Sequence, residues 1–169
     1  SDGGVAIVVT SEERARDLRQ TPAVILHATQ AVPFETEVVT NFYHHDLTRF
    51  DSGLAAAAEL YGKTGLGPED IQVAMLYDHF TIAVYWHLEA FGFCGPGEAR
   101  DYIAEGHIDL DGKTPLSPNG GLIGEAYIHG MNNISEAVRQ IRGTAVNPVS
   151  NVDNVLISAG MSAAILGRG

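Results

Sequence analysis

Short apolar runs alternate with helical segments along the chain, and this alternation restricts the folds available to it. Apolar runs of strand length occupy residues 5–9, 23–28, 73–76, 152–157 and 161–166. Helices are predicted between them, at residues 11–19, from 51 to a stop at 65, at 80–91, at 96–105 and in a long segment that ends at Gly143. Alternating strands and helices are typical of a layered α/β fold.

Polar residues near the predicted helix starts indicate how the helices begin. Ser11 can cap the first helix, because a serine oxygen accepts hydrogen bonds from the free amides of the first turn. Asp51 or Ser52 is predicted to cap the second helix in the same way. Asp78 can cap the helix that starts near Phe80, and this structural role competes with any role in a functional site.

The composition excludes several classes of protein. Ten Lys and Arg residues against 21 Asp and Glu residues give a formal charge of −11, which repels phosphate backbones, so nucleic acid is not expected as a partner. No apolar run approaches the roughly 20 residues that cross a bilayer, and the start lacks a signal-peptide pattern. We therefore expect a cytoplasmic protein without a membrane partner.

Cysteine and histidine usage gives no indication of a metal site. Cys94 is the only cysteine, so the chain has neither a disulfide framework nor a cysteine-based metal site, and it is predicted to be a small buried residue at a helix end. The pair His44-His45 lacks carboxylates or cysteines at ligand spacing and is better explained as a surface loop. His87 and His107 have no polar constellation around them and are predicted to be structural.

Two polar segments carry the chemistry that the rest of the chain lacks. The first reads Leu76-Tyr77-Asp78-His79-Phe80, and the second reads Ser117-Pro118-Asn119-Gly120-Gly121 and continues to Ala126-Tyr127-Ile128-His129-Gly130. Tyr77 follows a predicted strand and precedes a helix, which is where α/β proteins usually bind ligands. The two glycines give backbone freedom for a tight turn near a ligand. Alternatively, Tyr77 is a core aromatic residue and His129 is an ordinary polar residue in the first turn of its helix.

These segments resemble the active site of thiolases, and in particular the lipid-transfer-protein branch that includes sterol carrier protein x. Residues 77–80 stand where thiolases carry an Asn-Glu or His-Asp dipeptide, a small residue and Phe. Residues 117–121 resemble their Asn-Pro-Ser-Gly-Gly stretch, and residues 126–128 stand in place of Gly-His-Pro. Leu156 takes the place of their last catalytic cysteine, ahead of Ser158-Ala159-Gly160-Met161.

The resemblance implies a thiolase-like layered α/β/α fold over nearly the whole chain. Residues 1–45 would match the end of the thiolase N-terminal domain, with its last strands and link, and residues 46–169 would match the C-terminal domain. The nucleophilic cysteine of thiolases belongs to the preceding half. Because the apolar run at residues 5–9 has almost no sequence before it, we expect this chain to be a piece of a longer protein.

The departures from the thiolase pattern change the reaction that the resemblance implies. Tyr127 and Leu156 replace the histidine and cysteine that thiolases use for Claisen chemistry. The tyrosines look like those of the bacterial steroid side-chain-cleaving aldolases of the lipid-transfer-protein type. That group implies retro-aldol cleavage of a β-hydroxyacyl-CoA steroid side chain to a ring ketone and a short, propionyl-CoA-like acyl-CoA, in cholesterol degradation.

The same resemblance suggests roles for individual residues and partners. Tyr77 and Tyr127 would be the acid and base, His79 and His129 would tune or relay protons, and Asp78 would belong to the site. The turn that would bind substrate or CoA consists of Asn119, Gly120 and Gly121. Coenzyme A would enter as part of the substrate, with no other cofactor. A homodimer through the thiolase N-terminal half and a small OB-fold partner are implied as well.

Two other functions stay open at this point. A non-catalytic carrier of lipid or acyl-CoA would explain why the thiolase catalytic groups are missing. A thiolase-like acyltransferase would need a base elsewhere and a cysteine in the preceding half.

Overall fold

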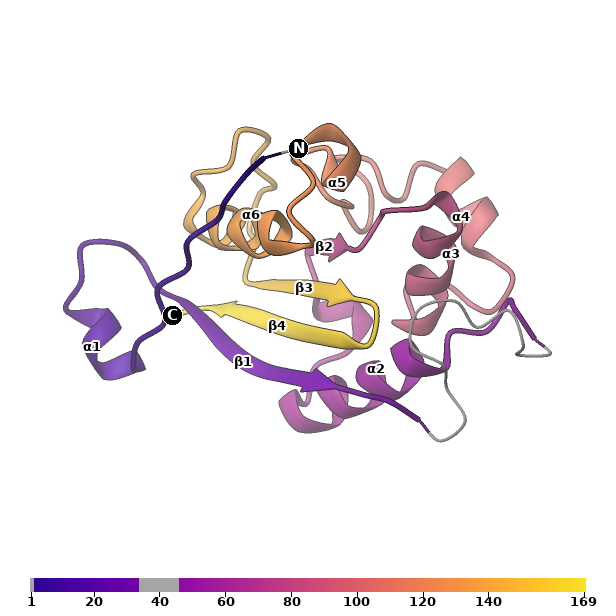
Figure 1. Ribbon diagram of the computed structural model, residues 1–169, viewed down its shortest axis with the longest axis horizontal. Coiled ribbons are helices and arrows are strands. Elements are labelled where there is room, and N and C mark those ends of the chain that lie inside the picture. The colour runs from indigo at the N-terminus through magenta and orange to yellow at the C-terminus, as the bar shows by residue number, and fades with distance from the viewer. Residues whose placement is uncertain (1, 34–45) are drawn as a thin grey trace.

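The computed structural model describes residues 2–33 and 46–169. The elements follow in the order α1 (Glu12–Arg16), β1 (Ala23–Gln30), α2 (Asp51–Thr64), a 3₁₀ turn (Pro68–Asp70), β2 (Val73–Leu76), α3 (Thr81–Ala90), α4 (Ala99–Ala104), α5 (Gly121–Gly124), α6 (Met131–Arg142), β3 (Asn154–Ala159) and β4 (Ser162–Arg168) (Figure 1). The alternation of strands and helices predicted from the sequence is confirmed.

The four strands form one mixed sheet in the order β1-β4-β3-β2. β2 runs parallel to β3, whereas β4 is antiparallel to both of its neighbours. The backbone N–H of Ser117 donates to the carbonyl of Ala74 at 2.9 Å, so the loop before α5 extends the sheet beyond β2. This contact brings the two polar segments together, although fifty residues separate them in the sequence.

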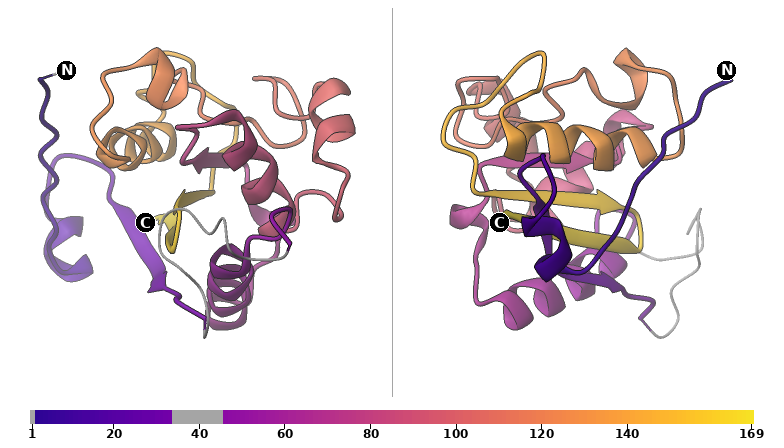
Figure 2. Two further views of the ribbon diagram at one scale, coloured as in Figure 1. Left: turned by 45° about the vertical axis from the view of Figure 1, so that its right-hand side comes forward. Right: turned by 90° about the vertical axis from the view of Figure 1, so that its left-hand side faces the viewer.

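Helices cover both faces of the sheet, as the turned views show (Figure 2). Alternate residues of a strand point to opposite faces. Accordingly, Val73 and Met75 pack under α6, while Ala74 and Leu76 pack against the core shared with α2 and α3. The layered α/β/α arrangement is therefore confirmed, and each layer is held by its own apolar cluster.

The predicted helix starts are right in one case and wrong in another. The backbone N–H of Arg14 donates to the side chain of Ser11, which confirms the cap of α1, although this helix ends at Arg16. α2 instead has Phe50 at its N-cap position, without a side-chain cap, and Ser52 is buried within its first turn. Phe50 packs against the core, so apolar packing sets the entry to α2 where the sequence predicts a polar cap.

The strand predicted at residues 5–9 is not present. These residues have no regular structure, and Val8 and Val9 are 89% and 72% exposed. A strand requires a neighbour that accepts and donates its backbone hydrogen bonds. No strand of the described part of the chain pairs with this segment, so a sequence of β-forming residues is not sufficient to make it a strand.

Candidate active site

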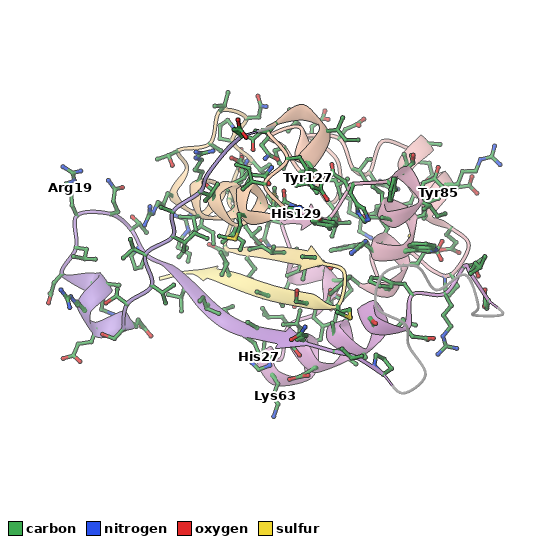
Figure 3. The ribbon with its side chains drawn as sticks, viewed as in Figure 1. Arg19, His27, Lys63, Tyr85, Tyr127 and His129 are labelled. Atoms are coloured by element: carbon green, nitrogen blue, oxygen red, sulfur yellow. The ribbon has the colours of Figure 1, made fainter. Side chains whose placement is uncertain are left out.

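The two tyrosines predicted to form the site lie in contact. β2 ends at Leu76, so Tyr77 is the first residue beyond the sheet, and its hydroxyl lies 2.5 Å from the hydroxyl of Tyr127. The same Tyr77 oxygen lies 3.2 Å from Nδ1 of His129. Figure 3 shows Tyr127 and His129 close together in the loop between α5 and α6. The site thus contains a continuous chain of three groups that can exchange protons.

The start of α6 holds this loop against the end of β2. Asn133, which is buried in the first turn of α6, donates from Nδ2 to the carbonyl of Leu76 at 3.0 Å. Gly130 has a φ of +82°, and a Cβ added there would lie 3.3 Å from the Tyr77 ring. His129 itself has a φ of 46°, a conformation that side chains other than glycine rarely adopt. Such strain persists only where the surroundings impose it, and here it aims the imidazole at Tyr77.

The environment of Tyr77 keeps its hydroxyl protonated. Burial, and then the hydrogen bond with Tyr127, raises the pKa of Tyr77 to about 12. Tyr77 is therefore a neutral donor and acceptor at neutral pH. When Tyr77 donates to His129, its oxygen lone pairs are available to accept the proton of Tyr127.

His79 contacts Tyr77 through its ring and its backbone. Nδ1 of His79 donates to the carbonyl of Tyr77 at 3.1 Å, and the two ring centres are 4.5 Å apart. Its ring centre also lies 4.7 Å from that of Phe80. His79 is thus positioned to orient the Tyr77 ring, while His129 is the histidine in contact with the hydroxyl.

Asp78 connects the two polar segments. Its Oδ1 accepts a hydrogen bond from the backbone N–H of Leu122 at 2.9 Å, across 44 residues of sequence. The predicted cap of the helix near Phe80 is wrong, because α3 has Phe80 at its N-cap position without a side-chain cap. The carboxylate is engaged by the start of α5. A Cβ on Gly121 would lie 1.8 Å from Oδ2 of Asp78, so the contact requires glycine there.

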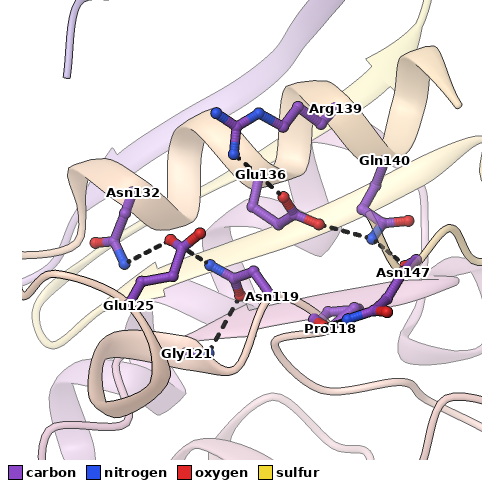
Figure 4. A network of polar contacts seen from close by, with 9 residues as sticks. All are labelled: Pro118, Asn119, Gly121, Glu125, Asn132, Glu136, Arg139, Gln140 and Asn147. Atoms are coloured by element: carbon purple, nitrogen blue, oxygen red, sulfur yellow. Dashed lines mark hydrogen bonds and ion pairs between the residues drawn. The ribbon is translucent and has the colours of Figure 1, made fainter. Parts of the chain in front are cut away.

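The predicted substrate-binding turn is closed by its own side chain. Oδ1 of Asn119 accepts from the backbone N–H of Gly121 at 3.2 Å, and its Nδ2 donates to Glu125 at 2.9 Å (Figure 4). Gly120 adopts a φ of +95°, which glycine allows. Asn119, Gly120 and Gly121 therefore lie together beside Asp78, and their contact with substrate stays a prediction.

A buried polar network behind this turn was not predicted. Glu136 is buried on the inner face of α6, and Gln140 donates to its carboxylate at 2.8 Å (Figure 4). Gln140 also donates to the carbonyl of Asn147, and Asn147 donates to the carbonyl of Pro118. Burial raises the pKa of Glu136. The signal in the sequence is a pair of polar residues at i and i+4 on the inward face of an amphipathic helix.

The remaining candidates of the sequence lie away from the tyrosine pair. Leu156 is fully buried within β3. His107 lies 3.1 Å from Glu105. Cys94 is half-buried, so the prediction of a buried residue is only partly right, and burial raises the pKa of its thiol to about 11, which keeps the thiol protonated near neutral pH. No group of three metal-ligating side chains occurs among the described residues, and His44-His45 lie outside them.

The arrangement defines a thiolase-like α/β domain in which tyrosines occupy the polar site. The chain belongs to the thiolase C-terminal domain-like family, whose model matches residues 36–165. It is 49% identical over 160 residues to the 17-hydroxy-3-oxo-4-pregnene-20-carboxyl-CoA lyase of Mycobacterium tuberculosis. The aligned region covers 95% of this chain and 42% of that protein. A steroid side-chain-cleaving aldolase of Thermomonospora curvata is also 49% identical over 160 residues, covering 95% of this chain and 41% of that protein.

A solved structure agrees with these relatives. The Ltp2-ChsH2(DUF35) aldolase superposes with a TM-score of 0.90 and 46% sequence identity, covering 93% of this chain and 42% of the solved chain. The chain therefore spans less than half the length of the relatives it matches. No helix in the described part of the chain is long and apolar enough to cross a membrane.

Proposed function

We propose that the chain forms the C-terminal part of a thiolase-fold aldolase, a carbon–carbon lyase of steroid degradation. Its substrate would be a β-hydroxyacyl-CoA steroid side chain, and its products a ring ketone and a short, propionyl-CoA-like acyl-CoA. Residues 1–45 would end the N-terminal domain, and residues 46–169 would form the C-terminal domain. The contact between Tyr77 and Tyr127 is the observation that carries the proposal.

The cleavage needs one proton removed and one added. The β-hydroxyl loses its proton and its carbon–oxygen bond becomes a carbonyl, while the bond between the α and β carbons breaks. The electron pair of that bond passes into the thioester as an enolate, which then takes a proton at the α carbon. A site for this reaction therefore needs a proton acceptor near the hydroxyl and a route that returns the proton.

The three-group chain of the site meets this need without a free tyrosinate. Tyr127 is 37% exposed and stands at the end of the chain opposite His129, so we place the substrate hydroxyl at Tyr127. As the bond breaks, Tyr127 accepts the substrate proton and passes its own to Tyr77, which passes its proton to Nδ1 of His129. Imidazole is the side chain that takes up protons near neutral pH. Reversal of the transfer protonates the α carbon.

The other members of the site act on the geometry of this chain. Asp78 fixes the turn formed by Asn119, Gly120 and Gly121 next to the end of β2. His79 orients the ring of Tyr77. We propose that the same turn contacts the thioester half of the substrate, whose coenzyme A is the only cofactor required.

Further partners follow from the charge of the chain and from its relatives. With ten basic residues and a charge of −11, the chain has few cations for the phosphates of coenzyme A. We propose that an OB-fold partner contributes to the CoA channel, that the enzyme dimerises through its N-terminal half, and that it works in the cytoplasm. The name of the solved relative, which joins Ltp2 and ChsH2(DUF35), supports a heteromeric assembly.

The test is incubation of the full-length protein with a β-hydroxyacyl-CoA steroid, with and without an OB-fold partner. We expect stoichiometric release of ring ketone and short acyl-CoA, measured by mass spectrometry. Recovery of intact substrate at binding stoichiometry would identify a carrier. Transfer of the acyl group to another thiol, without ketone, would identify an acyltransferase.

A further inference from the structure

An open groove adjoins the tyrosine pair and takes no part in the proton transfer described above. Its volume is about 540 Å³, and it is lined by His79, Phe80, Thr81, Ile82, Tyr85 and Ile123. We name it the apolar groove. It lies between the start of α3 and the exposed side of α5, and Figure 3 shows Tyr85 on α3.

The lining of the apolar groove selects an uncharged ligand. None of its six residues is an acid, a lysine or an arginine, although the chain as a whole carries a charge of −11. Phe80 is 67% exposed and Ile123 is 80% exposed. Large apolar side chains gathered at an open surface indicate a binding site. The phosphates of a CoA molecule find no cation in this lining.

The size of the groove fits a small molecule better than a protein surface. Its volume falls within the roughly 300–1,000 Å³ of small-molecule sites. A rigid apolar skeleton of fused rings matches the apolar lining of the groove.

The apolar groove is continuous with the catalytic chain. His79 lines the groove, and its ring centre is 4.5 Å from that of Tyr77. Ile123 follows directly on Leu122, whose backbone N–H is held by Asp78. The groove therefore borders the site on two sides, through the His79 ring that contacts Tyr77 and through the segment that Asp78 holds.

We propose, resting on the proposed function, that the apolar groove binds the fused rings of the steroid and thereby separates the two products. The ring ketone is held by Phe80 and Ile123, and the short acyl-CoA is held outside the groove. The groove is thus the element of this chain that selects the ring system.

The test measures direct binding of the two products to the full-length protein by isothermal titration calorimetry. The probes are a tetracyclic steroid ketone and propionyl-CoA. Phe80→Ala and Ile123→Ala are each expected to raise the Kd of the ketone on the order of tenfold, because each removes apolar contact area, and to leave the Kd of propionyl-CoA unchanged. Leu110→Ala is the matched control, because Leu110 is 54% exposed and lies outside the lining.

Three results would overturn the proposal. Unchanged ketone binding in both variants would place the rings elsewhere. An equal loss for propionyl-CoA would assign the groove to the thioester half. Altered assembly on gel filtration with normal ketone binding would assign it to a protein partner. Ile123→Ala guards against an indirect effect of Phe80→Ala, whose side chain touches His79.

The measurement is independent of turnover. If the protein binds the ketone in the groove but releases no ketone from the β-hydroxyacyl-CoA, the assignment of the groove stands and the proposed function is wrong. If the protein cleaves the substrate and its groove variants bind the ketone normally, the proposed function stands and the assignment of the groove is wrong.

Discussion

Two of the clusters that aromatic and histidine side chains form in the described part of the chain differ in what they can do. The site cluster contains Tyr77, His79, Tyr127 and His129 at the end of β2. The core cluster contains Phe50, His87 and Phe91, with the Phe50 and His87 ring centres 4.9 Å apart and the His87 and Phe91 rings parallel to within 3°.

Burial separates the chemistry of the two clusters. His87 is 2% exposed, its Nδ1 donates to the carbonyl of Ala83 at 2.6 Å, and burial lowers its pKa to about 4. It is held neutral and is closed to substrate. In the site cluster, His129 shares a hydrogen bond with a phenol that is itself linked to an exposed one. The same residue types therefore pack in the core in one place, and in the other form the hydrogen-bonded chain that we propose as a proton path.

The comparison is tested most strongly by removing the imidazole of His129 from the site cluster. His129→Gln is expected to lower the rate of ketone release by about a hundred- to ten-thousandfold, because the proton chain loses its terminal acceptor. Its thermal unfolding is expected to be unchanged. The control is His107→Gln, which removes a half-buried histidine that contacts Glu105 and Tyr102. A wild-type rate in His129→Gln would contradict the relay.

The site cluster also depends on one contact between a carboxylate and a glycine. Gly121→Ala places a Cβ 1.8 Å from Oδ2 of Asp78, at a φ of +65°, so Asp78 must move. We expect about a hundredfold loss of ketone release, because a displacement near 1 Å has effects of that size. Gly62→Ala is the matched control, since nothing lies within 4 Å of its added Cβ. Equal rates for the two variants would remove Asp78 from the account.

The core cluster is tested by the pH dependence of stability. The folded pKa of His87, about 4, lies below its ordinary value of 6.5. The unfolded chain therefore binds a proton first as pH falls, and the wild type loses about 3 kcal/mol between pH 6.5 and pH 4 from this group. His87→Asn keeps a donor for Ala83 but removes the titration. Denaturant unfolding at both pH values should show a flatter profile in the variant, and identical slopes would contradict this.

The smallest expected effect concerns the coupling within the site cluster. Burial, and then the hydrogen bond with Tyr127 and the charge of Tyr127, together raise the pKa of Tyr77 to about 12, so Tyr127→Phe removes the contribution of Tyr127 and leaves that of burial. The pKa of Tyr77 should fall, but stay above the ordinary value of about 10. Difference absorbance of tyrosinate, with the double Phe variant as the blank, measures it. An unchanged titration would mean that the two hydroxyls do not interact.

The sequence predicts most of the fold where the signals are local. Apolar runs of four to six residues predict β2, β3 and β4, and glycines predict the ends of α2 and α6. The failures involve partners that are distant in the sequence. Residues 5–9 have the composition of a strand but no strand beside them, and Phe50 begins α2 through core packing.

The residues that the structure brings together at the end of β2 could be selected from the sequence, but their contacts could not. Spacing and resemblance select Tyr77, Tyr127 and His129. The bond from Asp78 to Leu122 depends on how a loop of the second half lies along the sheet, which no local pattern records. The link from Gln140 through Asn147 to Pro118 likewise depends on how the loop after α6 lies against the turn before α5.

The central claim is that the two tyrosines move the proton as the carbon–carbon bond breaks. The most direct measurement is single-turnover ketone release by the full-length protein carrying Tyr77→Phe or Tyr127→Phe, at saturating β-hydroxyacyl-CoA steroid. Each variant should bind the substrate as the wild type does and release ketone at least about a hundredfold more slowly. Wild-type rates in both variants would contradict the account.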